Sequence, residues 1–358
     1  MTMPLPILKG RGTPLNPPNR FETLHIEADG DALDADLHEQ GAPPTRYLRD
    51  RTRSIITTND SPDVGFTHSV NPYRGCSHGC VYCYARPGHE YLGFSSGLDF
   101  ETRIMVKPDA PEMLRSELSR RSWRPVTLAF SGVTDCYQPI ERRLEITRQC
   151  LRVCAEFGNP VVVITKSALV TRDLDILAEM ARRSLAKVIV SVTTLDADLA
   201  RVMEPRAAAP KRRLATIRRL RDAGVPVGVF VAPVVPGLTD HEIPGILRAA
   251  AGAGAMFAGY VMLRLPFAIK DLFDDWLARH FPNRRPRVLN RLRSLRGGRL
   301  NDPGFGTRMR GEGPWAQQVQ AMFAQAKRQS GLDAPSPTLR TDAFRRPCDQ
   351  PTLWNPVD

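Results

Sequence analysis

Several features that would assign the sequence to familiar protein classes are missing from its 358 residues. No apolar run approaches the roughly 20 residues that a membrane-spanning helix needs. The N-terminus contains Pro4, Pro6 and Gly10, which interrupt the apolar core that a signal peptide requires. No glycine-rich dinucleotide or P-loop fingerprint follows the first expected strand. We therefore expect a cytoplasmic protein with no membrane partner.

Cysteine and lysine are both scarce, and each scarcity restricts the interpretation. The seven cysteines are odd in number and do not suggest a disulfide framework in a chain of this size. Only seven of the 50 basic residues are lysine, so arginine supplies most of the net charge of +12. This composition favours polyanionic partners and bidentate phosphate contacts, although a GC-rich genome produces the same bias.

Three of the cysteines lie within eight residues, spaced C-x3-C-x2-C, at Cys76, Cys80 and Cys83. Gly75 and Gly79 flank this loop and can adopt positive φ, which lets the backbone turn tightly. Such a loop can place three thiolates around an iron–sulfur cluster. A four-iron cluster has four corners, and no fourth cysteine lies close by. One iron would therefore stay open for a substrate or cofactor.

A structural zinc site is the alternative for these cysteines. It would need a distant fourth ligand, for which His78, His89 or a remote cysteine is available. Zinc sites usually combine two tight Cys or Cys/His pairs, and no second pair follows in this sequence. The spacing therefore favours the cluster.

Short apolar runs alternate with helical patterns along the middle of the chain. The runs predict strands over 126–130, 161–165, 188–192, 227–232 and 257–263, with a further strand before the cysteine loop. Helices are expected over 141–157, 169–183, 214–223 and 243–251, the last capped by Thr239 or Asp240. About six βα units indicate an α/β fold with a parallel sheet, either an open doubly wound sheet or a full or partial barrel.

The composition also divides the chain into four parts. Residues 1–65 are rich in Pro, Gly and Asp and predict an extended, partly disordered N-terminal arm. Residues 66–270 hold the α/β core, and residues 271–345 form a helical basic extension. Residues 346–358 are expected to be a flexible tail.

The pattern C-x3-C-x-Φ-C, with Tyr82 at the aromatic position Φ, resembles the signature of the radical S-adenosylmethionine (SAM) enzymes. The resemblance covers residues 66–270 and implies a partial (β/α)6 TIM-like barrel. It also implies that the three cysteines hold a [4Fe–4S] cluster whose open iron binds SAM. One electron from a low-potential donor would then cleave SAM and give a 5′-deoxyadenosyl radical that abstracts hydrogen from the substrate.

Three further segments, residues 71–73, 134–141 and 232–240, resemble the spore-photolyase branch of that superfamily, which repairs a thymine lesion in DNA. In that branch a cysteine after the second strand returns hydrogen to the product. Gly132 aligns with that cysteine here, and the nearby Cys136 is the candidate donor. This departure argues against the same lesion chemistry.

The resemblance also suggests where SAM is bound. Tyr82 would pack near the adenine. The segment with Ser131, Gly132, Thr134 and Asp135 takes the place of the glycine-rich stretch that receives the SAM amino group. Further polar contacts are expected at later strand ends and at a Glu/Arg pair, from Lys166, Ser191, Thr193, Glu204 and Arg213. For Ser191 and Thr193 the alternative explanation is ordinary strand composition. For Glu204 and Arg213 it is a helix cap and surface charge.

Two candidate partner surfaces lie near the C-terminus. An amphipathic helix is predicted by Val288, Leu292 and Leu295, and a cationic face that could bind DNA is formed by Arg284, Arg285, Arg287, Arg291, Arg293, Arg296 and Arg299. A further helix is expected over 315–327. In the tail, Gln350, Leu353 and Trp354 resemble the short peptide that docks on the bacterial DNA sliding clamp. A solvated arginine face and chance are the alternatives.

These observations favour a radical SAM enzyme that acts on a nucleic acid or nucleotide lesion. The first rival is a radical SAM enzyme that modifies a protein, RNA or small metabolite. The second rival is a non-catalytic, metal-bearing DNA-binding module.

Overall fold

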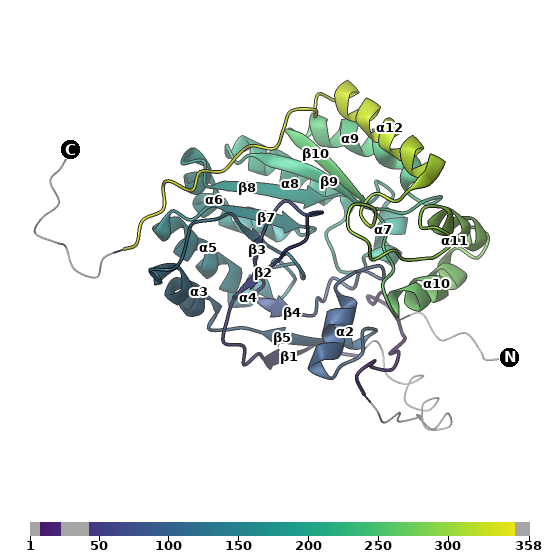
Figure 1. Ribbon diagram of the computed structural model, residues 1–358, viewed down its shortest axis with the longest axis horizontal. Helices are drawn as coiled ribbons and strands as arrows, with labels where there is room; N and C mark the ends of the chain where they lie inside the picture. The colour runs from purple at the N-terminus through teal and green to yellow at the C-terminus, as the bar shows by residue number, and fades with distance from the viewer. Residues whose placement is uncertain (1–7, 23–42, 348–358) are drawn as a thin grey trace, which may run out of the picture.

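The computed structural model describes residues 8–22 and 43–347, and a seven-stranded sheet forms its centre. Six strands run parallel and neighbour one another in chain order, so that the sheet curves as a partial barrel (Figure 1). They are β3 (His68–Val70), β6 (Leu128–Phe130), β7 (Val161–Thr165), β8 (Ala186–Ser191), β9 (Val227–Val234) and β10 (Phe257–Met262). The predicted (β/α)6 barrel is therefore confirmed.

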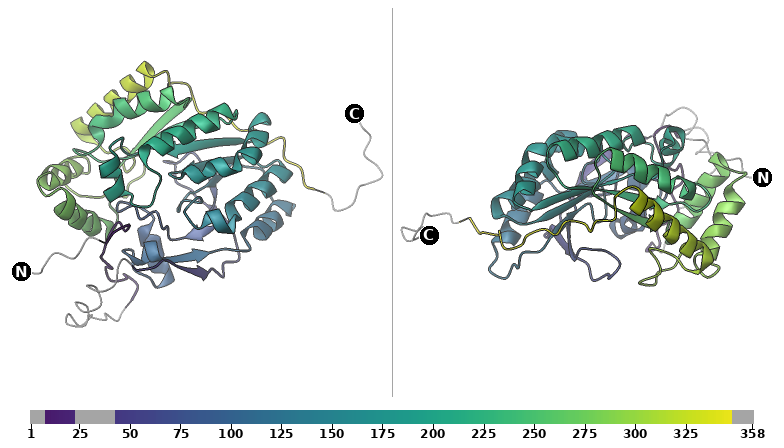
Figure 2. Two further views of the ribbon diagram at one scale, coloured as in Figure 1. Left: turned by 180° about the vertical axis from the view of Figure 1, so that it is seen from behind. Right: turned by 90° about the horizontal axis from the view of Figure 1, so that it is seen from above.

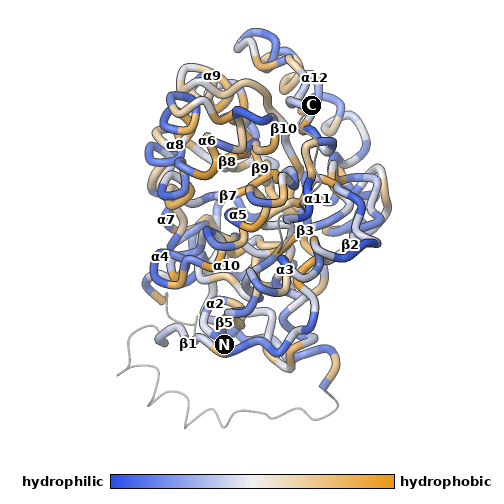
Figure 3. The backbone as a smooth tube through the Cα atoms, turned by 90° about the vertical axis from the view of Figure 1, so that its left-hand side faces the viewer, coloured by the Kyte–Doolittle hydropathy of each residue, from blue (hydrophilic) through white to orange (hydrophobic). Residues whose placement is uncertain are grey.

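The strands β6 to β9 are mostly apolar on both faces, and helices after them return the chain, as parallel strands require. The side chains of β7, β8 and β9 that face the covering helices, such as Val163, Val190 and Val229, are fully buried. The helices α5 (Ile146–Phe157), α6 (Leu174–Arg182), α8 (Pro210–Asp222) and α9 (Ile243–Gly252) cover the outer face, as Figure 2 shows from behind. Figure 3 shows the same division, with apolar strands inside and hydrophilic turns outside.

Two of the predicted helices are interrupted. The expected helix over 141–157 divides into α4 (Glu141–Leu144) and α5 because Glu145 adopts a left-handed conformation with φ of 54°. The expected helix over 169–183 begins with the 3-10 helix η2 (Ala168–Asp173). The predicted cap of α9 was wrong. The 3-10 helix η3 (Asp240–Glu242) precedes it, and the Thr239 hydroxyl instead accepts a hydrogen bond from the Val235 amide at 2.9 Å.

A small second sheet lies beside the barrel, next to the segment that carries the three cysteines. It contains β1 (Arg46–Arg49), β5 (Arg103–Val106) and β4 (Tyr73–Arg74). The connection from β3 to β6 also holds the 3-10 helix η1 (Arg86–Leu92) and the helices α2 (Asp99–Thr102) and α3 (Ala110–Ser119). The predicted N-terminal arm contributes β1 to this sheet and an antiparallel edge strand, β2 (Ile56–Thr58), to the main sheet.

The C-terminal part is helical, with α10 (Ile269–His280), α11 (Arg285–Ser294) and α12 (Gly313–Gln329). Val288 and Leu292 are fully buried, which confirms the predicted amphipathic helix, and α12 packs beside α9 (Figure 1). Beyond α12 the chain passes the ends of α6 and α5, where the Arg345 amide donates to Phe157 O at 2.8 Å. No helix in the described ranges is long and apolar enough to cross a membrane.

Candidate active site

A cavity of about 510 Å³ lies at the carboxyl ends of the barrel strands. The thiols of Cys76, Cys80 and Cys83 line it. The structure also brings most of the other predicted site residues to this cavity, namely Tyr82, Ser131, Gly132, Thr134, Asp135, Lys166 and Ser191. Thr193, Glu204, Arg213 and Cys136 are not among the lining residues.

The segment that carries the cysteines, residues 75–83, is called the cluster loop. Gly75 and Gly79 have φ values of 76° and 70°, as predicted, in a region that side chains rarely adopt. There is also no room for a side chain, since a Cβ at Gly79 would lie 2.7 Å from a Glu101 carboxylate oxygen. The Cys76 amide donates to Phe100 O at 2.9 Å, and the Cys83 amide donates to Cys80 O at 3.2 Å. Backbone constraints therefore hold the loop in one shape.

A buried ion pair supports the cluster loop from behind. Arg86 and Glu101 are both fully buried and contact each other at 2.5 Å. The Arg86 guanidinium also donates twice to the carbonyl of Cys80, at 2.9 and 3.0 Å. Charge-assisted bonds of this kind are roughly twice as strong as neutral ones. The pair therefore fixes the backbone at the middle cysteine.

The N-terminal segment completes this support. The Gly12 amide donates to the Glu101 carboxylate at 3.0 Å. A Cβ at Gly12 would lie 1.9 Å from Gly79 O, so only glycine permits this close approach. Gly12 and Glu101 thus belong to the site although the sequence did not point to them, because no local pattern links either residue to the cysteines.

The loop after β6 forms one wall of the cavity. Ser131 has a φ of 73°, an uncommon conformation for a residue other than glycine, and its hydroxyl accepts from the Cys136 amide at 2.8 Å. Gly132 lies against Ser69, where a Cβ would come within 2.7 Å of the Ser69 Cβ. The Thr134 hydroxyl donates to Tyr73 O at 2.8 Å. The loop is therefore held tightly against the strand that precedes the cysteines.

Asp135 is the centre of a polar group on that wall. Its carboxylate accepts from the Thr165 hydroxyl at 2.8 Å and from the Lys166 amide at 2.8 Å, and it lies 3.5 Å from His78 Nδ1. Burial lowers the pKa of His78, although the Asp135 charge opposes that change. The Lys166 ammonium donates to Ala232 O at 3.2 Å. These groups can orient the polar parts of a ligand within the cavity.

Tyr82, Glu204 and Arg213 form a buried network behind the cavity. Glu204 accepts hydrogen bonds from the Tyr82 hydroxyl, from Arg213 and from the Thr193 hydroxyl, the last at 2.7 Å. Burial alone would raise the pKa of Glu204, but the charges of Arg213 and Lys166 outweigh it and hold that pKa at about 2. Glu204 and Arg213 contact each other here, so a direct contact with SAM stays a prediction.

Cys136 occupies a different environment from the other predicted site residues. It is fully buried in the main hydrophobic core with Tyr73 and Cys150, and its carbonyl accepts from the Thr147 hydroxyl at 2.7 Å. Burial raises the pKa of its thiol well above the usual value. The structure therefore does not bring Cys136 to the cavity, which Asp135 lines instead.

The mouth of the cavity carries cationic and aromatic side chains that sequence reasoning missed. Tyr84 is 48% exposed, donates to Gly132 O at 2.7 Å and lies under the Arg264 guanidinium at 5.1 Å. Tyr84 could have been found from the sequence, because it directly follows Cys83 and is the second tyrosine beside that cysteine. Arg264 and Arg308 lie far along the chain from the cysteines, and no local pattern marks them.

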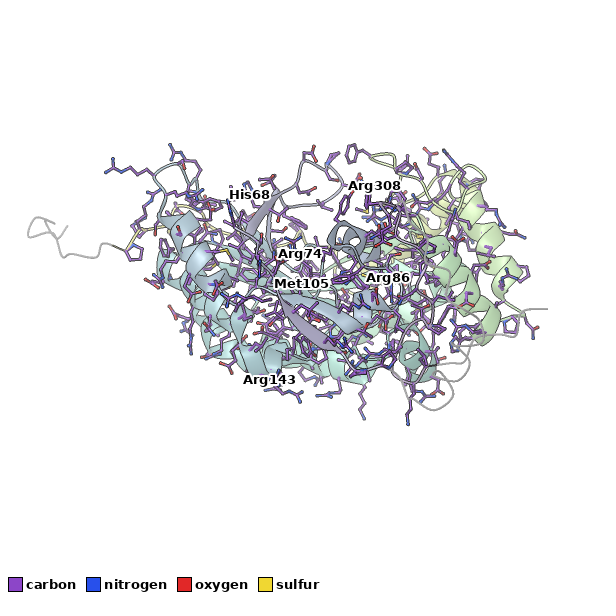
Figure 4. All side chains as sticks on the ribbon, turned by 90° about the horizontal axis from the view of Figure 1, so that it is seen from below. His68, Arg74, Arg86, Met105, Arg143 and Arg308 are labelled. Atoms are coloured by element: carbon purple, nitrogen blue, oxygen red, sulfur yellow. The ribbon has the colours of Figure 1, made fainter. Side chains whose placement is uncertain are left out.

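Two distant segments meet at this mouth and form what is called the clasp. The Arg308 guanidinium donates to the Asp63 carboxylate at 2.5 Å and to the Ser61 hydroxyl. The Gly306 amide donates to the same carboxylate at 2.7 Å. In Figure 4 Arg308 lies near the upper edge of the molecule, and Arg86 lies deeper within it. Ser61 and Arg308 both line the cavity, so the clasp joins the segment before β3 to the segment between α11 and α12 at this mouth.

The donor set fits an iron–sulfur cluster. Burial raises the pKa of Cys76 to about 12 and also raises the pKa of Cys80 and of Cys83, so a cationic partner is needed to ionise them. Within the described ranges no three His, Cys, Asp or Glu side chains converge on a single-ion site. Three cysteines from one loop, all lining the same cavity, match the three cysteine-bound irons of such a cluster.

The predicted arginine face is only partly free. Arg285 pairs with Asp274 at 2.6 Å and Arg291 with Asp240 at 3.2 Å, while Arg296 is 2% exposed and donates to Leu263 O. Arg296 therefore does not belong to a solvent-facing surface. The predicted clamp peptide, with Gln350, Leu353 and Trp354, lies outside the described residues, and no finding supports that partner.

Comparisons with known proteins bear on this site. The family model of the radical SAM superfamily matches residues 70–250, about half of the chain. An uncharacterised protein of Mycobacterium tuberculosis is 40% identical over 232 residues, which cover 64% of this chain and 67% of that one. The radical SAM Nalpha-GlyT isomerase of Pseudomonas phage M6 is 30% identical over 179 residues, covering 48% of this chain and 34% of that protein.

Among solved structures, the fold is similar to that of spore photoproduct lyase complexed with dinucleoside spore photoproduct. The TM-score is 0.55 at 16% sequence identity, and the match covers 79% of each chain. At this identity the likeness shows the fold alone.

Proposed function

The chain belongs to the radical SAM superfamily, and from this premise we propose that it acts on a nucleic acid or nucleotide, with a damaged or modified base as the reacting group. Its cofactors are a [4Fe–4S] cluster and SAM. Together they supply a 5′-deoxyadenosyl radical that abstracts hydrogen, after an electron arrives from a low-potential donor. Cys76, Cys80 and Cys83 would hold the cluster.

The chain's own residues would bind and orient SAM. The tightly held loop with Ser131, Gly132 and Thr134 is the candidate for receiving the amino group. Asp135, fixed by Thr165 and Lys166, would keep that loop in register with the cysteines. Tyr82 lines the cavity while its hydroxyl is held by Glu204, so its ring is the candidate platform for the adenine. These roles are proposals.

The side chains at the cavity mouth support a nucleic acid as the substrate. A half-exposed tyrosine ring, Tyr84, lies next to Cys83 and beneath Arg264, and Arg308 lines the same cavity. Aromatic rings that stack bases, combined with arginines that contact phosphates, are typical of surfaces that bind single-stranded nucleic acid. The names of two similar proteins support this choice. One structure is a spore photoproduct lyase that holds a dinucleoside spore photoproduct, and the phage relative is named a radical SAM Nalpha-GlyT isomerase.

The first test measures 5′-deoxyadenosine formed by anaerobic, cluster-loaded enzyme with SAM and a reductant. We expect single-stranded or irradiated DNA to stimulate the product and to transfer deuterium from labelled DNA into it. Stimulation by RNA, protein or metabolite alone would favour the first rival. A fully loaded cluster that yields no product under any condition would favour a non-catalytic binding module.

A variant pair tests the role of the mouth. Tyr84→Ala should weaken binding of single-stranded DNA by about 1–3 kcal/mol, because stacking is lost, and should leave the iron content unchanged. Tyr91→Ala is the matched control, since Tyr91 is 75% exposed and does not line the cavity. Equal affinities of the two variants, measured by fluorescence anisotropy, would remove the proposed mouth contact.

A further inference from the structure

A second pocket lies on the outer side of the cluster loop and is strongly cationic. Lys9, Arg11 and Arg206 line it, together with the hydroxyl-bearing Thr45 and Tyr47. Among the described residues no aspartate or glutamate lines this pocket. Lys9 and Arg206 are exposed, and neither has an ion pair within the described part of the chain. Three positive side chains therefore face one hollow to which the described part of the chain brings no counter-charge.

Hydrogen-bond donors in this pocket outnumber the acceptors. Both terminal nitrogens of Arg11 lie 3.2 Å from the Thr45 hydroxyl oxygen and also donate to the carbonyls of Glu101 and Pro43, whereas a terminal nitrogen of Arg206 points at the same hydroxyl at 3.1 Å. A hydroxyl oxygen has two lone pairs, so it cannot accept three such bonds. The remaining donors of Arg206 have no acceptor among the described residues. Counting residues 8–22 and 43–347 alone, the pocket thus offers no negative charge and leaves donors of Arg206 without an acceptor.

The two arginines also repel each other. Burial and the charge of Arg206 both lower the pKa of Arg11, whereas the Glu101 charge raises it. The Glu101 carboxylate does not neutralise the pair, because it is engaged with Arg86 and with the Gly12 amide. Like charges brought together at one hydroxyl are unfavourable unless an anion lies between them.

We propose that this pocket binds one phosphate group, held by Arg206, Arg11 and Lys9. A tetrahedral oxyanion offers the acceptors that Thr45 lacks, and guanidinium groups match its geometry in a bidentate way. The phosphate comes either from a free ion such as inorganic phosphate or pyrophosphate, or from the backbone of a nucleic acid. The second source rests on the proposed function.

The pocket is joined to the cluster loop by backbone contacts. The Arg206 amide donates to His78 O at 3.1 Å, and an Arg11 terminal nitrogen donates to Glu101 O at 3.2 Å. Gly12, the next residue, packs on Gly79. An anion held by Arg11 and Arg206 would therefore tie the N-terminal segment to the loop that carries the cysteines.

The test measures binding of inorganic phosphate and of pyrophosphate to the full chain by phosphorus NMR and calorimetry. Arg206→Gln and Lys9→Gln should each weaken binding, Arg206→Gln by about tenfold or more, because a charge-assisted contact is lost. Arg142→Gln removes the same charge from an exposed residue outside the pocket and should leave binding unchanged. Equal loss of binding in Arg142→Gln would overturn the proposal. Absence of saturable binding of both probes would exclude a free ion as the ligand, and the DNA measurement then decides whether the pocket binds a backbone phosphate.

Anisotropy with a DNA oligonucleotide at several salt concentrations distinguishes the two sources. If the backbone supplies the phosphate, Arg206→Gln should weaken DNA binding and reduce the salt slope by about one. If only the free ions lose affinity, the source is a small oxyanion. Unchanged binding of phosphate, pyrophosphate and DNA in Arg206→Gln overturns the proposal. These readouts do not depend on 5′-deoxyadenosine formation, so the failure of this proposal and of the proposed function can be told apart.

Discussion

The cluster loop and the clasp lie on the same cavity but are built in different ways. The cluster loop is supported by Arg86 and Glu101, which are fully buried, and by glycines packed too closely for a side chain. The clasp depends on one ion pair, Asp63 with Arg308, and two hydrogen bonds beside it, between segments more than 240 residues apart. Arg308 keeps 19% of its side chain exposed. The first arrangement is rigid, and the second can open at low cost.

This difference matches what each region has to do. Three thiols must keep a fixed geometry to hold a cluster, so their backbone is over-determined. A substrate has to enter and leave, so the mouth needs contacts that can break and form again. If the two regions differ in this way, changes near the cluster loop should cost more stability than changes at the clasp.

The largest effect is expected from Arg86→Gln. It leaves the buried Glu101 carboxylate without its cation, which typically costs about 3–5 kcal/mol, and it removes the bonds to Cys80 O. The free energy of unfolding in denaturant should fall by this amount, and the iron content should fall with it. Arg120→Gln, which removes an exposed pair with Glu117 at 2.9 Å, is the control and should cost less than about 1 kcal/mol. Similar losses in both variants would contradict a specially supported loop.

A smaller effect should appear on acidification, through His89. This residue is 1% exposed beneath the cluster loop, and burial lowers its pKa from 6.5 to about 4. Since the unfolded state takes up the proton first, stability is complete above pH 6.5 and is lost as the pH falls towards 4. We expect a loss of about 1 kcal/mol between roughly pH 6.5 and 5.5. His89→Phe should reduce that slope in denaturant titrations, because His78, whose pKa burial also lowers, still contributes to it, whereas His241→Gln, at an exposed position, should leave it unchanged.

The smallest effect on stability is expected at the clasp. Arg308→Gln should cost about 1 kcal/mol or less, because the ion pair is partly solvated. The mouth should nevertheless open more often, so the rate of iron release to a chelator should rise by about fivefold at most. Arg299→Gln, an exposed neighbour that does not line the cavity, should not change that rate. An unchanged rate in Arg308→Gln would show that the clasp does not control access.

The fold was predictable to the extent that local patterns decide it. A continuous apolar run between two helices fixes a buried parallel strand, and the run at 161–165 matches β7. The break at Glu145 was not predictable, because glutamate carries no turn signal and its left-handed conformation is imposed by packing. The same applies to α9, where Thr239 resembles a cap but is used inside the preceding turn.

The site shows the same division. The cysteine spacing and the flanking glycines were readable because a cluster constrains neighbouring residues in the sequence. Glu101 and Arg308 were not, because their partners lie elsewhere in the chain and only the folded structure joins them. Cys136 illustrates the opposite error. It is close to the site in sequence, but its side chain is buried in the main hydrophobic core.

The clasp and the Gly12 contact also bear on how the protein can be cut for expression. The family model matches only residues 70–250. A fragment with these limits would lack Asp63, Arg308, Gly12 and the edge strands β2 and β10. It would keep the three cysteines yet expose them to solvent and leave Glu101 without one of its donors. A soluble domain trimmed to the family boundaries is thus a poor substitute for the longer chain in biochemical work.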